Sequence, residues 1–189
     1  MGICLTSAVL NRAVFLDRDG VINEALVRDG KPYPPANVGE TVIVDDAVTS
    51  LERLKRQGFL LIVVTNQPDV SRGSTTRQSV EDIHRYLETR LPLDEFGVCY
   101  HDDKDACTCR KPLPGLLLNA ASRHGIALQR SYLVGDRWRD IDAGASAGCK
   151  TILIDYGYNE RSGTHSPDMR VDSLSQAVDW ILSQETESF

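Results

Sequence analysis

The sequence predicts an α/β fold in which one parallel β-sheet carries helices on both faces, giving three layers. Short apolar runs, each too short for a helix, alternate along the chain with longer segments whose apolar residues recur at helical spacing. Several apolar runs end in a chemically active residue, as at Asp17, Thr65 and Asp136. Because ligands bind at the carboxyl ends of strands in open parallel sheets, this recurrence predicts one crevice along that edge.

The first strand is expected over residues 13–17, after an N-terminal extension of residues 1–12. Its apolar residues run into Asp17-Arg18-Asp19-Gly20, where the glycine permits a sharp turn. Residues 24–44 contain three prolines and two glycines, so an irregular loop is expected there.

The next helix can be capped by Asp45 or Asp46 and is expected to end at Gly58. Its buried face should carry Val48, Leu51 and Leu54. The continuous apolar run of residues 59–64 predicts a second buried strand, which the polar residues 65–68 end.

Thr75 and Gln78 resemble a capping box and predict the start of another helix. Its buried face should carry Val80, Ile83, Leu87 and Leu91. A short strand is expected over residues 97–100.

The C-terminal half continues the alternation. Helices are expected over residues 115–124 and 141–147, each followed by a glycine, and strands over residues 131–134 and 151–154, the latter being the last core strand. Residues 155–168 form a polar loop. A last helix, which Ser173 can cap, should bury Leu174, Val178, Ile181 and Leu182. These elements make a single domain of residues 13–185.

Composition narrows the class of protein. The 189 residues are 41% hydrophobic and 25% charged, as in an ordinary globular domain, and the net charge of −6 argues against nucleic-acid or anionic-membrane partners. No stretch approaches the roughly 20 apolar residues of a membrane span. The five cysteines are odd in number and three are clustered, which favours a metal site in a reducing compartment, so a cytoplasmic location is expected. No stretch outside the domain indicates a surface for a partner, so a monomer is expected.

The strand-end residues suit phosphate ester hydrolysis. Asp17 can attack phosphorus as a carboxylate nucleophile, and Asp19 is placed to protonate the leaving alkoxide and then activate water. The Thr65 hydroxyl can hold phosphate oxygens, and Lys111 can stabilise the charge of the transferring phosphoryl group.

Two adjacent carboxylates call for a cation. Asp136 ends another apolar strand and can complete a Mg²⁺ site with Asp17, since Mg²⁺ prefers oxygen ligands. Asp140, four residues further on, can support that site from outside the metal's own ligands or cap the next helix.

These residues, in this order, resemble the motifs of the haloacid dehalogenase superfamily of phosphatases. The matching motifs are Asp17-Arg18-Asp19-Gly20, Thr65-Asn66, Lys111, and Gly135-Asp136 with Asp140. The resemblance implies a Rossmann-like sheet and an aspartyl-phosphate intermediate on Asp17. It further implies Mg²⁺ held by Asp17, the Asp19 carbonyl and Asp136.

Four soft ligands, Cys99, His101, Cys107 and Cys109, fall within eleven positions. Zinc binds four such ligands tetrahedrally, and a site that the protein fills completely is structural. We therefore expect a zinc-bound loop over residues 99–109, which replaces a large cap domain and fixes Arg110 and Lys111 after it. Arg110 is then placed to select the substrate.

This insertion resembles the zinc-containing, capless branch that includes heptose 1,7-bisphosphate 7-phosphatases and histidinol-phosphate phosphatases. The resemblance implies Mg²⁺ and Zn²⁺ as cofactors and a small phosphorylated sugar as substrate, with removal of the 7-phosphate of the heptose bisphosphate. Contacts with substrate are expected from Asn66, Gln67, Arg72, Arg110 and Arg137. Arg72 can equally be a solvated loop charge.

Two alternatives stay open. The five residues between His101 and Cys107 favour a histidinol-phosphate phosphatase or another small sugar-phosphate phosphatase. A zinc-stabilised binding module without catalysis would require a missing catalytic residue, and the motifs above lack none.

Overall fold

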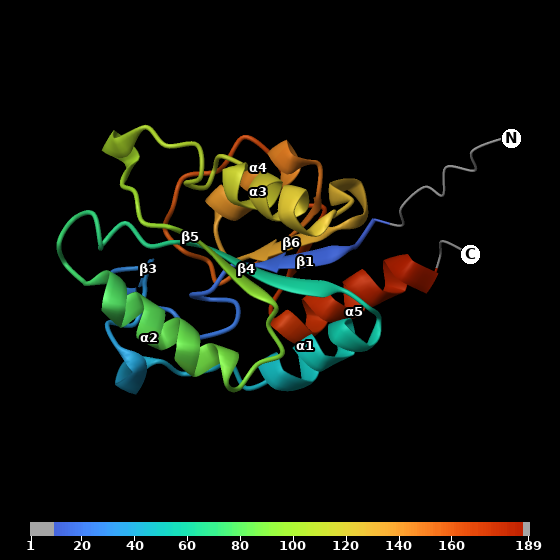
Figure 1. The fold of residues 1–189 in the computed structure, drawn as a ribbon, viewed down its shortest axis with the longest axis horizontal. Coiled ribbons are helices and arrows are strands. Elements are labelled where there is room, and N and C mark those ends of the chain that lie inside the picture. The colour runs from blue at the N-terminus through green and yellow to red at the C-terminus, as the bar shows by residue number, and fades with distance from the viewer. Residues whose placement is uncertain (1–9, 187–189) are drawn as a thin grey trace, which may run out of the picture.

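A computed structural model describes residues 10–186 of the chain and confirms the predicted three-layer α/β fold (Figure 1). All six strands of the main sheet are parallel to their neighbours. Their order across the sheet is β5 (Glu95–Cys99), β4 (Leu60–Asn66), β1 (Ala13–Leu16), β6 (Tyr132–Gly135), β7 (Lys150–Ile154) and β8 (Met169–Val171).

Five α-helices cover the two faces of this sheet within residues 10–186. One face carries α1 (Ala47–Arg56), α2 (Arg77–Glu88) and α5 (Leu174–Thr186), and the other carries α3 (Gly115–His124) and α4 (Trp138–Ala147).

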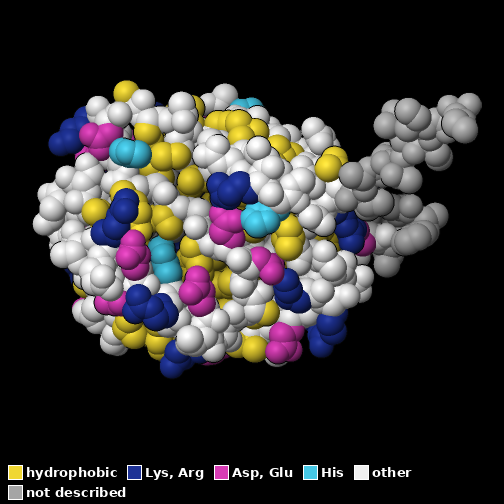
Figure 2. Space-filling view, in the orientation of Figure 1, with side chains coloured by type: hydrophobic (Ala, Val, Ile, Leu, Met, Phe, Trp, Pro, Cys, Tyr) yellow, Lys and Arg dark blue, Asp and Glu magenta, His cyan; other side chains and the backbone are white. Residues whose placement is uncertain are grey.

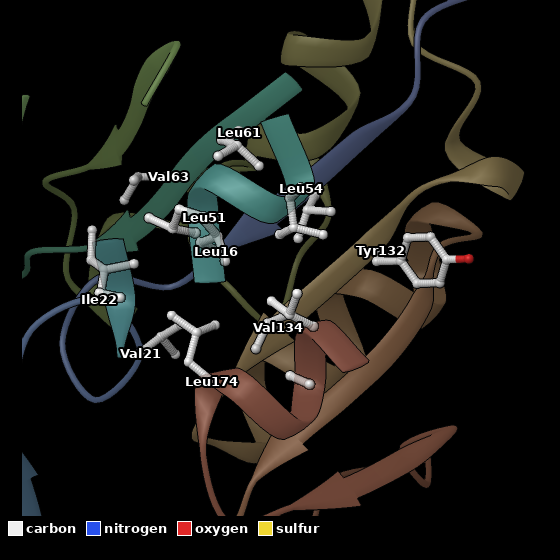
Figure 3. Packing of buried hydrophobic residues seen from close by; sticks show 14 of the residues in the cluster. Leu16, Val21, Ile22, Leu51, Leu54, Leu61, Val63, Tyr132, Val134 and Leu174 are labelled. Carbon is white, nitrogen blue, oxygen red and sulfur yellow. The ribbon is translucent and has the colours of Figure 1, made fainter. Parts of the chain in front are cut away.

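The two faces of β1 pack into two separate cores, because successive strand side chains point to opposite sides. Val14 and Leu16 join the core under α1, α2 and α5, whereas Ala13 and Phe15 join the core under α3 and α4. Figure 3 shows Leu51 of α1 beside Leu16 in the first of these cores. With all four β1 side chains fully buried, the strand that carries Asp17 is anchored from both sides.

The expected irregular loop over residues 24–44 was wrong in part. It contains a hairpin of β2 (Leu26–Arg28) and β3 (Lys31–Tyr33), followed by a 3-10 turn at Val38–Glu40. The hairpin turn is Asp29-Gly30, and both residues have positive φ (51° and 71°), as a tight two-residue hairpin turn requires. The Asp-Gly pair was therefore the signal in the sequence.

The helix α1 begins directly after Asp46, as expected, but two predicted details of it were wrong. Val48 is 40% exposed, because the buried stripe of α1 runs through Ala47, Leu51 and Leu54 and leaves Val48 at its edge. The Asp46 side chain makes no capping hydrogen bond to α1 within the described chain and instead accepts one from the Ser175 backbone in α5 (2.7 Å).

The cap of α2 is one residue later than expected. The Thr76 hydroxyl accepts a hydrogen bond from the Ser79 backbone (3.0 Å), so Thr75 and Gln78 do not form the capping box. The helix α4 begins at Trp138 rather than 141, and β8 is a short strand that the sequence analysis missed.

The remaining predicted elements lie where the sequence placed them, within one to two residues. No helix among residues 10–186 is long and apolar enough to cross a membrane. Figure 2 shows basic and acidic side chains interspersed over one face of the molecule, close to one another rather than gathered by sign. Of the expected N-terminal extension, residues 1–9 lie outside the described chain.

Candidate active site

Three neighbouring strands bring the predicted residues together at the carboxyl edge of the sheet. Asp17 follows β1, Thr65 lies near the end of β4, and Asp136 follows β6. A small cavity of about 70 Å³ opens there, and Asp17, Thr65 and Lys111 line it, as do Asp19, Asn66, Arg137 and Asp140. Asp136 lines a neighbouring cavity of about 300 Å³ instead, but its carboxylate lies within 4.8 Å of the carboxylates of Asp17 and Asp140. The sheet topology therefore brings together residues that are far apart in the sequence.

Lys111 is buried at the centre of this group. Its Nζ lies 2.8 Å from Asp17 Oδ1 and 2.5 Å from Asp140 Oδ1, and it also donates to the Val64 carbonyl. The Asn66 side chain holds the Lys111 backbone from both sides, because its amide donates to the Lys111 carbonyl (2.9 Å) and its oxygen accepts from the Lys111 N–H (3.0 Å). Asn66 therefore fixes where the ammonium group points.

Burial and like charge shift the titration of the carboxylates. Burial, together with nearby Asp140 and Asp19, raises the pKa of Asp17 to about 6 although Lys111 opposes the shift. Burial, together with Asp17 and Asp140, likewise raises the pKa of Asp136 well above its usual range. Burial disfavours the charged form of Lys111, yet Asp140 and Asp17 hold its pKa above the ordinary value. The three carboxylates of Asp17, Asp136 and Asp140 carry more negative charge than the one ammonium group of Lys111 neutralises.

This acidic group has the composition of a divalent-cation site. Asp17, Asp136 and Asp140 each offer a carboxylate oxygen, and these atoms lie within 4.8 Å of one another. Both oxygens of Asp136 are buried and have no well-formed hydrogen bond from the described residues, although the Tyr158 side chain lies near this carboxylate. Gly20 leaves room for this carboxylate, because a Cβ there would lie 2.1 Å from Asp136 Oδ2. Oxygen ligands and uncompensated charge fit Mg²⁺.

Asp140 has further roles. Its Oδ2 accepts a hydrogen bond from the Arg137 backbone (3.1 Å), so it caps α4 while it also pairs with Lys111. The two predicted roles of Asp140, support of the cation site and helix capping, are thus compatible in one side chain.

The Asp19 carboxylate is held by donors on several sides. Arg18 Nη2 donates to it at 2.9 Å, Asn23 Nδ2 at 3.0 Å and Gln67 Nε2 at 2.9 Å. Gln67 also donates to the Thr65 hydroxyl, is 2% exposed, and does not line the cavity around Asp17. The structure therefore places Gln67 beneath the pocket, where it positions Asp19 and Thr65.

A buried histidine supports this arrangement and was missed in the sequence analysis. Arg18 is fully buried, and its Nη1 lies 3.1 Å from His84 Nε2 on α2. The His84 ring stacks on Phe96 at 4.4 Å between centroids. Burial, with the positive charge of Arg18, lowers the pKa of His84 to about 3, so His84 is neutral and can accept from Arg18. Its position between Ile83 and Leu87, on the buried face of α2, is the feature of the sequence that could have predicted its burial.

A second cavity of about 280 Å³ adjoins the first and is rich in arginine. Three predicted substrate-binding residues line it: Arg72, Arg110 and Arg137. Each already has an acidic partner, namely Asp102, Asp103 and Glu160 respectively. Arg139 lines both cavities and was not singled out from the sequence.

The four soft ligands also converge. Sγ of Cys109 lies 3.1 Å from Sγ of Cys99 and 3.6 Å from Sγ of Cys107, and 3.4 Å from Nδ1 of His101. A tetrahedron with zinc–sulfur bonds of about 2.3 Å has edges of roughly 3.8 Å, close to most of these separations. Gly115 at the start of α3 lets the loop pack closely, because a Cβ there would lie 2.3 Å from the Thr108 carbonyl oxygen. The donor set and spacing fit Zn²⁺.

Comparison with known proteins agrees with this geometry. A family profile described as HAD-hydrolase-like matches residues 108–177. The chain is 33% identical over 179 residues to the D-glycero-beta-D-manno-heptose-1,7-bisphosphate 7-phosphatase of Helicobacter pylori, which covers 90% of this chain and 97% of the relative. The chain therefore belongs to the haloacid dehalogenase-like hydrolases.

More relatives point to the same branch. The D-glycero-D-manno-heptose-1,7-bisphosphate 7-phosphatase of Chlorobaculum tepidum is 34% identical over 197 residues, covering 93% of this chain and 96% of the relative. Among solved structures, the D,D-heptose 1,7-bisphosphate phosphatase of B. bronchiseptica, complexed with magnesium and phosphate, aligns with a TM-score of 0.74 at 26% identity. That alignment covers 92% of this chain and 99% of the other.

Proposed function

We propose that this chain is a Mg²⁺-dependent phosphatase that removes the 7-phosphate of D-glycero-D-manno-heptose 1,7-bisphosphate. Relatives with that name match it over nearly their whole length at 30–34% identity. The observation that carries the proposal is that Asp17 and Asp136, at the carboxyl ends of β1 and β6, lie buried together with the Lys111 ammonium group, which reaches Asp17 from the loop before α3. A carboxylate nucleophile beside a fixed cation and a cation site is the equipment for phosphoryl transfer.

The reaction follows from the positions of the side chains. A carboxylate oxygen of Asp17 attacks phosphorus while the bond to the sugar oxygen breaks, and Asp19 gives that oxygen a proton. Asp19 then takes a proton from water, whose oxygen attacks phosphorus and frees Asp17 and inorganic phosphate. Lys111 and the Thr65 hydroxyl hold the phosphoryl oxygens throughout.

Magnesium, held by Asp17, Asp136 and the Asp19 carbonyl, would supply positive charge next to the phosphoryl oxygens. The chain's own contribution is to keep Asp17 ready to attack. Lys111 pairs with Asp17 Oδ1, so the other oxygen of that carboxylate is the one available as nucleophile.

We propose that Cys99, His101, Cys107 and Cys109 hold a structural zinc ion. With all four positions filled by protein ligands, none remains for substrate. Cys109 stands two residues before Lys111, so the ion would fix the start of the segment that carries both Arg110 and the catalytic lysine.

The test is phosphate release from a panel of esters in the presence of Mg²⁺: heptose 1,7-bisphosphate, histidinol phosphate and simple sugar monophosphates. We expect the heptose bisphosphate to give the highest kcat/KM and phosphorus NMR to show loss of the 7-phosphate. A preference for histidinol phosphate, which the short spacing between His101 and Cys107 favours, would overturn the substrate. No release from any ester would overturn the phosphatase.

A further inference from the structure

Arg139 connects the two cavities of the site. It is among the residues that line the 70 Å³ cavity around Asp17 and also among those that line the adjoining 280 Å³ cavity. Its guanidinium Nη1 donates to the Lys111 carbonyl at 3.3 Å, and the group lies over the Trp138 ring at 4.8 Å. A molecule that is cleaved at Asp17 and extends into the larger cavity would therefore pass Arg139.

Asp103 is shared by two arginines that line the larger cavity with it. Its Oδ1 accepts from Arg110 Nε at 2.8 Å and from Arg139 Nη1 at 3.3 Å, and its Oδ2 lies 3.5 Å from Arg139 Nη2. The contacts to Arg139 are long, so its guanidinium is only weakly satisfied. Arg110 Nη1 is buried and has no hydrogen-bond partner among the described residues. Two guanidinium groups thus face the cavity with unused donor capacity.

The charges around the larger cavity favour an anion. Five cationic side chains line it against three acidic ones, Asp69, Asp103 and Glu160. Arg110, Arg137 and Arg139 all line this cavity, so like charges repel one another there. A dianion placed among these groups would relieve that repulsion and satisfy the open donors.

We propose that Arg139 is a specificity-determining residue that binds the second phosphate of a bisphosphate substrate, and that Asp103 occupies this subsite until the substrate displaces it. The inference rests on the proposed function and deepens it. Asp103 is an internal stand-in for phosphate: its carboxylate keeps Arg110 and Arg139 in place and lowers the cost of holding two like charges together. Its side chain is 60% exposed, so it can leave without opening the core.

The first experiment compares two substrates that differ only in the second phosphate, heptose 1,7-bisphosphate and heptose 7-phosphate. In Arg139→Met we expect KM for the bisphosphate to rise on the order of 10- to 100-fold, with kcat within about twofold and the monophosphate unaffected. Arg161→Met is the matched control, because Arg161 lies over the same Trp138 ring (4.2 Å) but lines a different cavity. It should leave both substrates unchanged.

The second experiment uses a variant that should lower KM for the bisphosphate instead of raising it. Asp103→Asn removes the competing charge, so KM for the bisphosphate should fall about two- to fivefold, whereas KM for the monophosphate should not change. Arg139→Gln, which keeps a polar side chain of similar length, repeats the Arg139 measurement, and circular dichroism checks the fold of each variant.

Different failures have different meanings. Equal losses on both substrates in Arg139→Met would show that Arg139 only supports the Lys111 backbone, which overturns the inference. A higher KM for the bisphosphate in Asp103→Asn would show that Asp103 positions the arginines and does not compete, and this also overturns it. A wild-type protein that hydrolyses neither ester would overturn the proposed function itself.

Discussion

Two groups of potential metal ligands lie at the same edge of the sheet, yet the fold makes them in opposite ways. The acidic group of Asp17, Asp136 and Asp140 is buried, and its members follow β1 and β6 or lie in the first turn of α4. The thiol group starts at Cys99, the buried end of β5, but its other members stand on a more exposed loop. One group is built by the core and the other by a loop.

This difference separates what each ion would do. The strands that carry the acidic group are fixed by packing, so removing the cation leaves repelling carboxylates on an intact scaffold. The loop after Cys99 is held by polar contacts at its surface, such as the Asp105 carboxylate accepting from the Asp102 N–H and the ion pair of Asp102 with Arg72, and it buries few apolar groups. Its order should therefore depend on the bound ion. We therefore expect the ion at the acidic group to serve catalysis, and the ion at the thiol group to keep its loop ordered.

Removing the nucleophile should give the largest effect. Asp17→Asn keeps the shape of the side chain but leaves an amide that cannot form the phosphoenzyme, so turnover should fall on the order of 10⁴-fold or more. Phosphate release with Mg²⁺ measures this, and thermal unfolding should show an intact fold. Asp45→Asn, at an exposed position, is the matched control.

Because the substituted side chain would still sit in the same rigid pocket, a large drop in melting temperature would contradict the view that the core alone builds this group. Turnover close to wild type would remove Asp17 from its role as nucleophile. Either result would contradict the view that the acidic group is a catalytic site built on a rigid core.

Losing a thiol ligand should give the next largest effect. We expect one zinc per chain by elemental analysis of the wild type and less in Cys109→Ala. Proteolysis should then cut at the exposed Lys104, and turnover should fall roughly 10- to 100-fold because Lys111 stands two residues after Cys109.

Cys149→Ala is the control for a buried thiol outside the cluster, and it should keep its zinc and its resistance to proteases. Magnesium removal should stop turnover without making the chain susceptible to cleavage at Lys104. Equal protease resistance in Cys109→Ala and the wild type would show that the loop orders itself, which breaks the comparison.

The sequence could predict those parts of the site that parallel strands determine. Asp17, Thr65 and Asp136 each follow an apolar run, and the topology of parallel sheets alone brings such positions to one edge. The thiol group could be predicted equally well, because its ligands are close in the sequence. The Asp29-Gly30 pair also predicts a hairpin turn from local sequence alone, although the sequence analysis overlooked it.

The rest depends on contacts between distant segments. Arg18 contacts His84 only because α2 packs beside the loop after β1, and the sequence of neither segment predicts this contact. Arg139 meets Asp103 across 36 positions for the same reason. The capping hydrogen bond predicted for Asp46 was wrong for the same reason. Its carboxylate accepts a hydrogen bond from α5, which packs next to α1 but begins far later in the chain.

The smallest expected effect tests the scaffold beneath the acidic group. Burial and Arg18 lower the pKa of His84 to about 3, against about 6.5 in the unfolded chain, while Asp19 opposes the shift. Between these values the unfolded chain binds a proton that the folded chain refuses, so stability falls as the pH falls below about 6.5. From pH 8 to pH 5 this one residue should cost about 2 kcal/mol of unfolding free energy.

Urea unfolding at both pH values measures this cost. His84→Gln, which can still accept from Arg18 but does not titrate, should lose about 2 kcal/mol less than the wild type between pH 8 and pH 5. His165→Gln, at a side chain that is 45% exposed, is the matched control and should follow the wild type. Identical pH dependence in His84→Gln and the wild type would mean that His84 takes up its proton within the fold. The Arg18–His84 contact would then yield to acid, and the acidic group would rest on a scaffold less rigid than the packing of β1 indicates.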